Sequence, residues 1–332
     1  SRGFRAPNVN DFSSVGLTSN GFEVSPDQAA QAGAFIGTAA STAAVSSGTP
    51  ARQLAPEALL DYESGLRLHT DRVWGSVSVF HYGLEDFITR RAIILAPGAV
   101  GSTIGGQTIT QQLPSGAVIT AADPRPVITR ANVGRVRLRG FEGDLNVKLG
   151  SPWLFSATIS HVRGVDVATG QTPDIEGGLP PLLGFVSLRW QPARRPFWIE
   201  TFSHWSDKQD RLSSIELSDQ RIGASRTRSS IAAFFNNGAV ARGLVANGIL
   251  LATGETLAQV QDRVLGVSAQ GAPLFTSTPG FATLNFRGGY RMGERSEVIA
   301  VFENVLDRNY RLHGSGVDSV GRNLQLTYLL RF

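Results

Sequence analysis

Side chains near the carboxyl end of the chain alternate between apolar and polar. The segment from Leu324 to Phe332 reads LQLTYLLRF. One face carries Leu324, Leu326, Tyr328, Leu330 and Phe332, and the other carries Gln325, Thr327, Arg331 and one apolar residue, Leu329. Because a β-strand sends successive side chains to opposite faces, this segment is predicted to be a strand. Its apolar face would meet a core in a soluble sandwich, or lipid in a membrane barrel.

The same period recurs along the chain and predicts ten strands. They lie at residues 1–7, 60–69, 73–88, 132–149, 153–161, 184–190, 197–205, 281–291, 297–303 and 324–332. Their connections alternate in length, because those near 70–72, 150–152, 191–196 and 292–295 are tight and the others run from roughly fifteen to seventy residues. Short periplasmic turns on one rim and long extracellular loops on the other are typical of an antiparallel up-and-down transmembrane β-barrel.

One predicted strand, residues 132–149, is longer than a membrane crossing requires. Phe141, Leu145, Val147 and Leu149 share a face, and Arg135, Arg137 and Arg139 continue that face beyond Phe141. These arginines could not face lipid. Either the upper part of the strand stands above the membrane, or a bulge near Gly140 reverses the alternation.

The longer connections show little periodicity. Residues 8–49 and 90–130 are rich in Gly, Ala, Ser, Thr or Pro and are predicted to be loops. Residues 207–278 form the longest connection, in which Thr253 to Gly266 is predicted to be a helix, with Thr253 as its cap and Gly266 as its end.

Composition excludes several classes of function. The chain of 332 residues has 31 basic and 27 acidic residues and a net charge of +4, with no dense Lys/Arg run, so nucleic acid is not an expected partner. Cysteine is absent, which excludes thiol chemistry, disulfides and Cys-bound zinc. No stretch of eighteen consecutive apolar residues predicts a transmembrane helix, and no signal peptide precedes Ser1, as in a mature or truncated product.

Several motifs together resemble those of TonB-dependent outer-membrane receptors. They are GFRAPN at 3–8, LAPE at 54–57, DYESGL at 61–66, PGFATLN at 279–285, ENVLDRNY at 303–310 and the terminal Phe332. The resemblance spans nearly the whole chain. It implies a barrel of about 22 strands around an amino-terminal plug. The chain would then be the carboxyl-terminal portion of the barrel, without the plug, the energy-coupling box or the first strands.

The resemblance also implies partners. These are bacterial outer-membrane lipid, the barrel-assembly machinery, an extracellular nutrient ligand and a TonB-type energy-coupling complex that acts through the plug. Tyr328, Leu330 and Phe332 resemble the terminal assembly signal of outer-membrane proteins. FRAP at 4–7 resembles one motif of heme receptors, but their NPNL motif is missing and no His lies between residues 8 and 68, so heme is not indicated.

No residue pattern predicts catalysis, a metal site or a cofactor. The five histidines, at positions 69, 81, 161, 204 and 313, are widely spaced and are expected to be structural or solvated. Glu63 and Glu200 are expected to face the lumen and to hydrogen-bond or pair with Arg67, Arg189 or Arg287. The pattern does not identify ligand-binding residues.

Three functions remain open. The first is a receptor for energy-coupled uptake of a scarce, large nutrient such as a ferric siderophore, cobalamin or a saccharide. The second is a passive porin, and the third is a surface structural or adhesion barrel. A plug with a coupling box in the upstream reading frame would favour the receptor.

Overall fold

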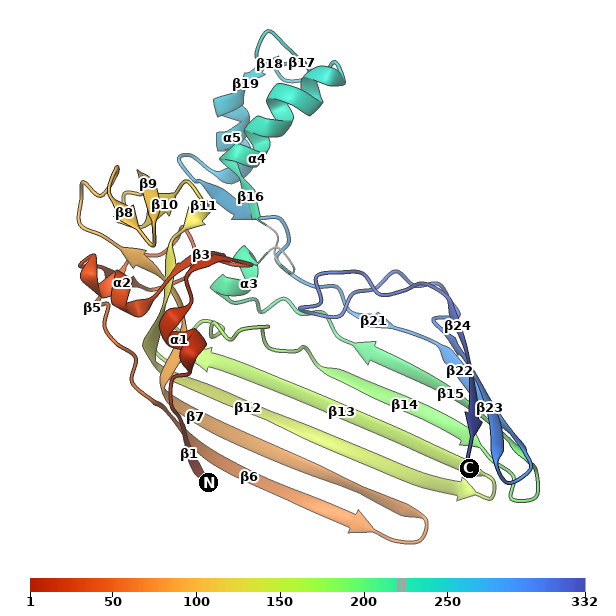
Figure 1. Cartoon of the computed structure of the whole chain (residues 1–332). Helices are drawn as coiled ribbons and strands as arrows, with labels where there is room; N and C mark the ends of the chain where they lie inside the picture. Colours follow the sequence, from red (N-terminus) through yellow and green to blue (C-terminus); the bar gives the residue numbers. More distant parts are fainter. Residues whose placement is uncertain (220–221, 223–224, 332) are drawn as a thin grey trace.

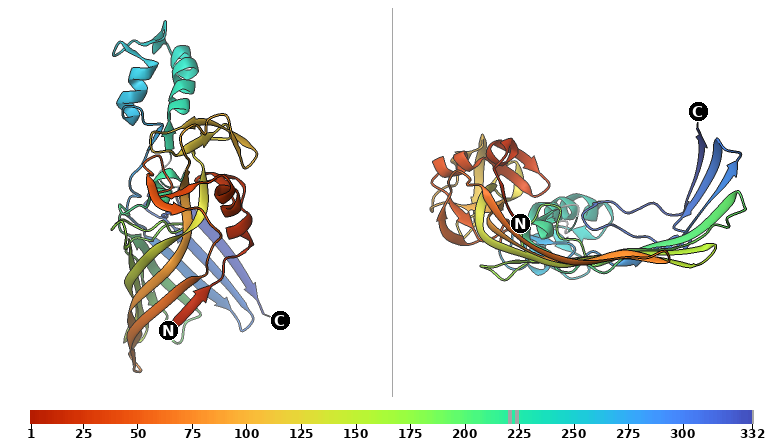
Figure 2. Two further views of the ribbon diagram at one scale, coloured as in Figure 1. Left: turned by 90° about the vertical axis from the view of Figure 1, so that its left-hand side faces the viewer. Right: turned by 90° about the horizontal axis from the view of Figure 1, so that it is seen from below.

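Ten antiparallel strands form one continuous wall in the computed structural model, which describes residues 1–219, 222 and 225–331. In spatial order, which is also chain order, they are β1 (Arg2–Arg5), β6 (Glu57–His69), β7 (Val73–Ile94), β12 (Ile128–Gly150), β13 (Trp153–Asp166), β14 (Leu183–Trp190), β15 (Phe197–Ser206), β22 (Asn285–Met292), β23 (Ser296–Glu303) and β24 (Asn323–Leu330). The wall curves into an open trough (Figure 1; Figure 2, right). The prediction of ten strands with up-and-down topology is confirmed.

Connections at one end of the wall are tight and those at the other end are long. The tight turns join β6 to β7, β12 to β13, β14 to β15 and β22 to β23. The five long loops are residues 6–56, 95–127, 167–182, 207–284 and 304–322, which we call loops 1 to 5 in chain order. The segregation predicted from the sequence is therefore confirmed.

The convex face of the wall is apolar. Cross-strand pairing places on this face Leu66, Leu68, Val77, Val79, Phe141, Leu145, Val147, Phe155, Val186, Leu188, Ile199, Phe286, Val298, Phe302, Leu324, Leu326 and Leu330. Leu66, Leu324 and Leu326 are 78%, 73% and 75% exposed. An apolar surface of this extent is a membrane-contacting surface, and pairing between neighbouring strands satisfies backbone groups that would otherwise lack a hydrogen-bond partner in lipid.

The register of strand β12 decides between the two explanations for Arg135, Arg137 and Arg139. Its register with β7 and β13 is continuous from Val136 to Val147, and the register shift falls between Lys148 and Gly150. The bulge considered near Gly140 is therefore absent from this strand. With 23 residues, β12 is about 76 Å long at the usual rise, well beyond the height of an apolar band. Its arginine-bearing part stands above that band.

Loops 1 and 2 fold into a compact subdomain above β7 and β12 (Figure 1), which we call the cap. Its elements are α1 (Val9–Ser13), β2 (Gly16–Thr18), β3 (Gly21–Val24), α2 (Pro26–Gln31), β4 (Phe35–Gly37), β5 (Ser46–Pro50), β8 (Thr103–Ile104), β9 (Gln107–Gln112), β10 (Val118–Thr120) and β11 (Asp123–Pro126). Phe22, Ile93, Ile109 and Val127 lie in its buried core. Residues 8–49 and 95–127 lie in long loops as predicted, but these loops have regular structure, because scattered apolar residues from both segments share one core. Residues 90–94 and 128–130, also predicted to be loop, belong instead to β7 and β12.

Loop 4 contains a small helical unit that projects beyond the cap (Figure 2, left). The elements of loop 4 as a whole are α3 (Ser214–Ser218), β16 (Ser225–Thr227), α4 (Arg228–Ala233), the π-helix η1 (Phe234–Ala239), β17 (Val245–Ala246), β18 (Ile249–Leu250), β19 (Glu255–Thr256), α5 (Leu257–Leu265), β20 (Gly271–Pro273) and β21 (Phe281–Ala282). Helix α5 ends at Gly266 as predicted, but Thr256 caps it instead of Thr253. Among the described residues, no helix is long and apolar enough to cross a membrane.

Aromatic side chains mark the lower edge of the convex face. Trp153 lies 6.3 Å from Trp190, and Trp190 lies 5.4 Å from Phe197, between ring centroids. Trp198 lies on the concave face, where its indole N–H donates to Glu297 at 3.0 Å. Phe197 and Trp198 are consecutive in β15, so their side chains point to opposite faces of the wall.

Candidate ligand-facing wall and extracellular cap

The concave face of the wall is mostly polar and faces the loops. Loop 3 reaches this face, because the side chain of its Leu179 and that of Leu138 in β12 both border Gly164. Cross-strand pairing adds Asp61, Glu63, Arg67, Ser76, Ser78, Glu142, Asp144, Asn146, Ser156, Thr158, Ser187, Arg189, Glu200, Arg287, Gln325 and Thr327. Ser156 donates to Asn146 at 2.8 Å. A solute inside the barrel would meet hydrogen-bonding groups on this wall.

An ion pair anchors the carboxyl-terminal half of this wall. Arg287 donates from Nε to Glu200 at 3.0 Å and from Nη2 at 2.9 Å, so the predicted lumen pairing of Glu200 is confirmed. Arg189 instead lies over the ring of Trp198, 4.0 Å from its centroid. Glu63 forms no ion pair with Arg67 within the part of the chain that the structure describes.

Buried ion pairs attach the cap to the wall. Glu23 of β3 accepts from Arg90 of β7 at 2.8 Å and from Arg130 of β12 at 3.0 Å. Arg130 also donates to Asp11 of α1 at 3.0 Å, and Arg5 donates to the other oxygen of Asp11 at 2.7 Å. Both carboxylates are almost wholly buried. Buried charges are tolerated only when they are paired and hydrogen-bonded, and each of these has two guanidinium partners.

A second buried cluster connects β7 to loops 3 and 4. Arg91 contacts Asp174 of loop 3 through a charged hydrogen bond and reaches Asp166 of β13 at 3.5 Å. Asp174 also accepts from the hydroxyl of Ser214 at 2.9 Å and from the backbone N–H of Ile215 at 3.1 Å, at the start of α3. One carboxylate therefore holds three segments that are far apart in sequence.

His313 connects loop 5 to loop 4. Its Nε2 lies 2.7 Å from Glu216 Oε1 in α3, and its Nδ1 lies 2.9 Å from the hydroxyl of Thr278. Gln209, opposite Thr278 in a β-bridge, donates from its side chain to the carbonyl of Leu179 in loop 3. The expectation that His313 is structural agrees with these contacts.

The pH dependence of the cap follows from Asp11. Burial alone would raise the pKa of Asp11, but the backbone N–H of Asn8 and the guanidinium groups of Arg5 and Arg130 outweigh it and hold the pKa below its ordinary 3.8. A lowered folded-state pKa gives stabilisation that is present above pH 3.8 and lost as the pH falls through the folded-state value. The melting-temperature difference between wild type and Asp11→Asn should therefore be constant near neutral pH and shrink below about pH 4.

Thermal unfolding between pH 2 and 8 measures this difference. Asp318→Asn, which removes a carboxylate paired at the exposed surface of loop 5, serves as the control and should give a small difference. A pH-independent difference for Asp11→Asn would contradict the assignment.

Motifs that carry the family resemblance meet in pairs. Arg5 of the FRAP segment contacts Glu57 of the LAPE segment across β1 and β6. Asn285 accepts at 2.7 Å from the backbone N–H of Asn304, which starts loop 5 with a positive φ of 49°. These motif residues stabilise strand ends, and no ligand role follows from them.

The predicted assembly signal is described only in part. Tyr328 and Leu330 lie on the convex face, and the hydroxyl of Tyr328 is 3.0 Å from that of Ser296. Phe332 lies outside the described residues. Phe332→Asp is expected to lower the yield of folded barrel in outer membranes severalfold, because a charge would replace the terminal apolar group. Arg331→Asp, on the other parity, is the matched control, and equal membrane yields for both variants would contradict the signal.

Sequence reasoning missed the residues that hold the cap and loops. No sequence motif marks Glu23, Arg90, Arg130 or Asp174. The one local signal is that the arginines at 90 and 91 interrupt an otherwise apolar strand end. Among the described residues, no group of three or more His, Cys, Asp or Glu side chains could hold a metal ion.

Comparison with known proteins assigns the family. The family model for the β-barrel of TonB-dependent-receptor-like proteins matches residues 1–312, so the chain belongs to this family. Membership places it in the bacterial outer membrane, in a class of receptors and not of enzymes. No curated protein matches the chain in sequence.

Solved structures resemble the chain at low sequence identity. The copper transporter OprC is 14% identical with a TM-score of 0.51, and 84% of this chain aligns with 32% of that chain. The FrpB iron transporter from Neisseria meningitidis (F3-3 variant) is 15% identical with a TM-score of 0.49, over 85% of this chain and 32% of that one. A mutant of the ferric enterobactin receptor from Pseudomonas aeruginosa is 14% identical with a TM-score of 0.49, over 99% and 37%. The chain thus spans about a third of their length.

Proposed function

We propose that this chain is the carboxyl-terminal part of the barrel of an energy-coupled receptor that imports a scarce, large nutrient. The observation that carries the proposal is an open ten-stranded wall that matches the receptor-barrel family. Among the described residues, strands β1 and β24 pair with a neighbour on one side only, and unpaired strand edges are very costly in lipid. Further strands of the same receptor would close the barrel around a plug.

The concave wall and the cap support a role in ligand handling. The wall offers carboxylates, guanidinium groups, hydroxyls and amides to a solute, which suits a large polar molecule. Asp174, Glu216 and His313 connect loops 3, 4 and 5 above the wall through hydrogen bonds, so these loops have a defined arrangement there. By analogy with the family, a TonB-type complex would act on the plug to release the ligand.

A ferric siderophore, cobalamin or a saccharide is the proposed class of nutrient. The test is growth of a deletion strain with each of these as the limiting source of iron, cobalamin or carbon. One condition should show a defect that the full reading frame restores. Normal growth in all three would overturn these substrate classes.

The alternative function is a passive porin, and two measurements distinguish it from an energy-coupled receptor. Uptake through the receptor should stop in a strain that lacks the energy-coupling complex, whereas diffusion through a porin would continue. In planar bilayers, the full-length protein should conduct small ions poorly. Free conductance together with coupling-independent uptake would overturn the receptor proposal.

A further inference from the structure

The helical unit of loop 4, residues 225–273, carries an open groove that we call the tip groove. It has a volume of about 400 Å³, and its lining comes mainly from α4, η1 and α5. Ile231, Phe234, Leu244 and Val264 are among the apolar residues that line it, and Arg226 is the charged residue of the lining. Sites for small ligands have volumes of about 300–1,000 Å³ and are mostly apolar, with a few polar groups. The tip groove has both features.

The ring of Phe234 forms part of the groove and stays 51% exposed, although its neighbour Phe235 is buried. Both residues begin the π-helix η1, and this rare conformation is frequent at functional sites. Gly238 makes room for the ring, because a Cβ atom there would lie 2.8 Å from a ring carbon of Phe234. The ring therefore packs over Gly238 and leaves apolar surface exposed at the groove.

The core of the helical unit is small and leaves the groove open. Among the described residues, its cluster of buried side chains consists of Phe235, Ala239, Val245 and Val260. Leu244, which lines the groove beside this core, is 47% exposed. Removing apolar surface from water is favourable in proportion to its area, and a small domain buries only a modest fraction of its surface by itself. An apolar ligand in the groove would extend this core.

Both carboxylates of the helical unit are already paired. Residues 225–273 contain four arginines and two acidic residues, Glu255 and Asp262. Arg263 donates to the two oxygens of Glu255 at 2.6 and 2.9 Å. Arg228 pairs with Asp262 and donates from Nε to the carbonyl of Ala269 at 2.8 Å. The unit therefore has no free carboxylate for its other two arginines.

These other two arginines lie at the tip groove. Arg226 lines the groove, and the guanidinium of Arg242 lies over the ring of Phe234, 5.7 Å from its centroid. Both side chains are exposed, and neither forms an ion pair within the part of the chain that the structure describes. The tip groove thus combines an apolar lining with two unpaired cations, which complements a ligand that is apolar and negatively charged.

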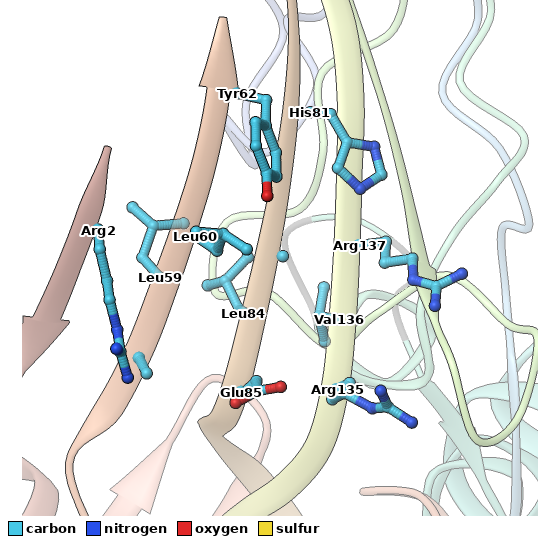
Figure 3. Close-up of a pocket in the computed structure, with 12 residues that line it drawn as sticks. Arg2, Leu59, Leu60, Tyr62, His81, Leu84, Glu85, Arg135, Val136 and Arg137 are labelled. Carbon is cyan, nitrogen blue, oxygen red and sulfur yellow. The ribbon is translucent and has the colours of Figure 1, made fainter.

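The position of the tip groove makes it accessible to solutes from the medium. The helical unit projects beyond the cap, away from the wall (Figure 2, left). A second hollow, lined by Tyr62, His81, Arg135 and Arg137 among others, belongs to the wall itself (Figure 3). That hollow adjoins the apolar convex face, whereas the tip groove lies on the loop side of the molecule and apart from the concave wall.

We propose that the tip groove binds a small amphiphilic anion, which consists of an apolar body and one carboxylate. The apolar body would cover Phe234 and Leu244 and remove their exposed surface from water. The carboxylate would accept charge-assisted hydrogen bonds from Arg226 or Arg242, because a guanidinium group matches the two oxygens of a carboxylate. The site is separate from the concave wall, so it does not depend on the proposed transport.

Cysteine labelling of the full-length protein in nanodiscs tests the proposal, with decanoate below its micelle-forming concentration as the probe. Leu244→Cys places a thiol in the groove, and Val267→Cys, at a position that is 82% exposed and outside the groove lining, is the control. Mass spectrometry of the labelled peptides gives the rate at which a water-soluble maleimide modifies each thiol. Decanoate should slow modification at 244 severalfold and leave 267 unchanged. Decanol, which has the same chain without the charge, should protect 244 much less.

Charge variants in the Leu244→Cys background test the two arginines. Arg226→Gln/Arg242→Gln should raise the decanoate concentration that gives half-protection about tenfold, as expected for the loss of a charge-assisted hydrogen bond. The matched control, Arg194→Gln/Arg195→Gln, removes two exposed charges at the tight-turn rim. It should leave the half-protecting concentration unchanged.

Hydrogen exchange of the wild-type protein does not depend on the folding of any variant. Decanoate should slow amide exchange in η1 and α5, because a ligand that binds the folded unit stabilises it, and should leave exchange in the cap unchanged. Unchanged exchange in η1 and α5, or equal protection of thiols 244 and 267, would overturn the proposal. Equal protection by decanoate and decanol, or equal half-protecting concentrations for the two double variants, would also overturn it. Growth phenotypes are independent of each outcome.

Discussion

Replacing Arg91 with Met is expected to destabilise the folded protein by about 3–5 kcal/mol. Arg91 and Asp174 are each 5% exposed in their side chains, and Asp166 is 10% exposed. Removing the guanidinium would leave two buried carboxylates without their cation, and such groups cost far more unpaired than the pair itself contributes. Chemical unfolding of the purified barrel measures the change in free energy.

Arg322→Met is the control for this effect. Arg322 pairs with Asp307 at 3.4 Å, but the two side chains are 60% and 51% exposed, so the loss should be within about 1 kcal/mol. Adding Asp174→Asn to Arg91→Met should recover part of the lost stability. If Arg91→Met and Arg322→Met were equally stable, the buried cluster would not hold the loops.

A methyl group at Gly75 is expected to disrupt the wall between β7 and β12. A Cβ atom there would lie 2.2 Å from the carbonyl oxygen of Asp144 and 3.0 Å from the Cα of Leu145, both backbone atoms that cannot rotate away. The strands would have to separate, so Gly75→Ala should cost about 3 kcal/mol or more, at the upper end for overpacking. Heat-modifiable migration of the barrel on gels reports the loss as a lower transition temperature.

Gly83 provides a matched control in the same strand and on the same face. A Cβ atom at Gly83 would meet only the Leu60 carbonyl oxygen, at 3.9 Å, which is an ordinary contact. Gly83→Ala should therefore leave the transition temperature nearly unchanged. Equal transition temperatures for the two variants would contradict the close approach of β7 and β12.

The strands of the wall could be predicted because their signal is local. Alternation at Leu324, Leu326 and Tyr328 reports a half-apolar strand within a few residues, and the tight turns follow directly from the gaps between strands. The N-cap residue of helix α5 could also have been predicted from the sequence. Thr256 and Gln259 have the spacing of a capping box, which Thr253 lacks.

The cap and its ion pairs could not be predicted in the same way. Glu23 and Arg90 are 67 residues apart, and Glu23 and Arg130 are 107 apart. No local period connects such residues, and their burial depends on how loops 1 and 2 fold together. The position of the three arginines of β12 relative to the membrane could not be decided from the sequence for a similar reason. Only pairing with the neighbouring strands shows that the register continues past Gly140.

The most direct measurement of the central claim, that one face of this wall meets lipid and the other meets water, is spin labelling along β12. The chain has no cysteine, so single cysteines at 137, 139, 141 and 143 to 147 can each carry one label. Labels at 141, 143, 145 and 147 should collide mainly with lipid-dissolved oxygen, and labels at 144 and 146 with a water-soluble relaxation agent. Labels at 137 and 139 should also meet the aqueous agent. Uniform accessibility along 141 to 147, or oxygen-dominated accessibility at 137 and 139, would contradict the account.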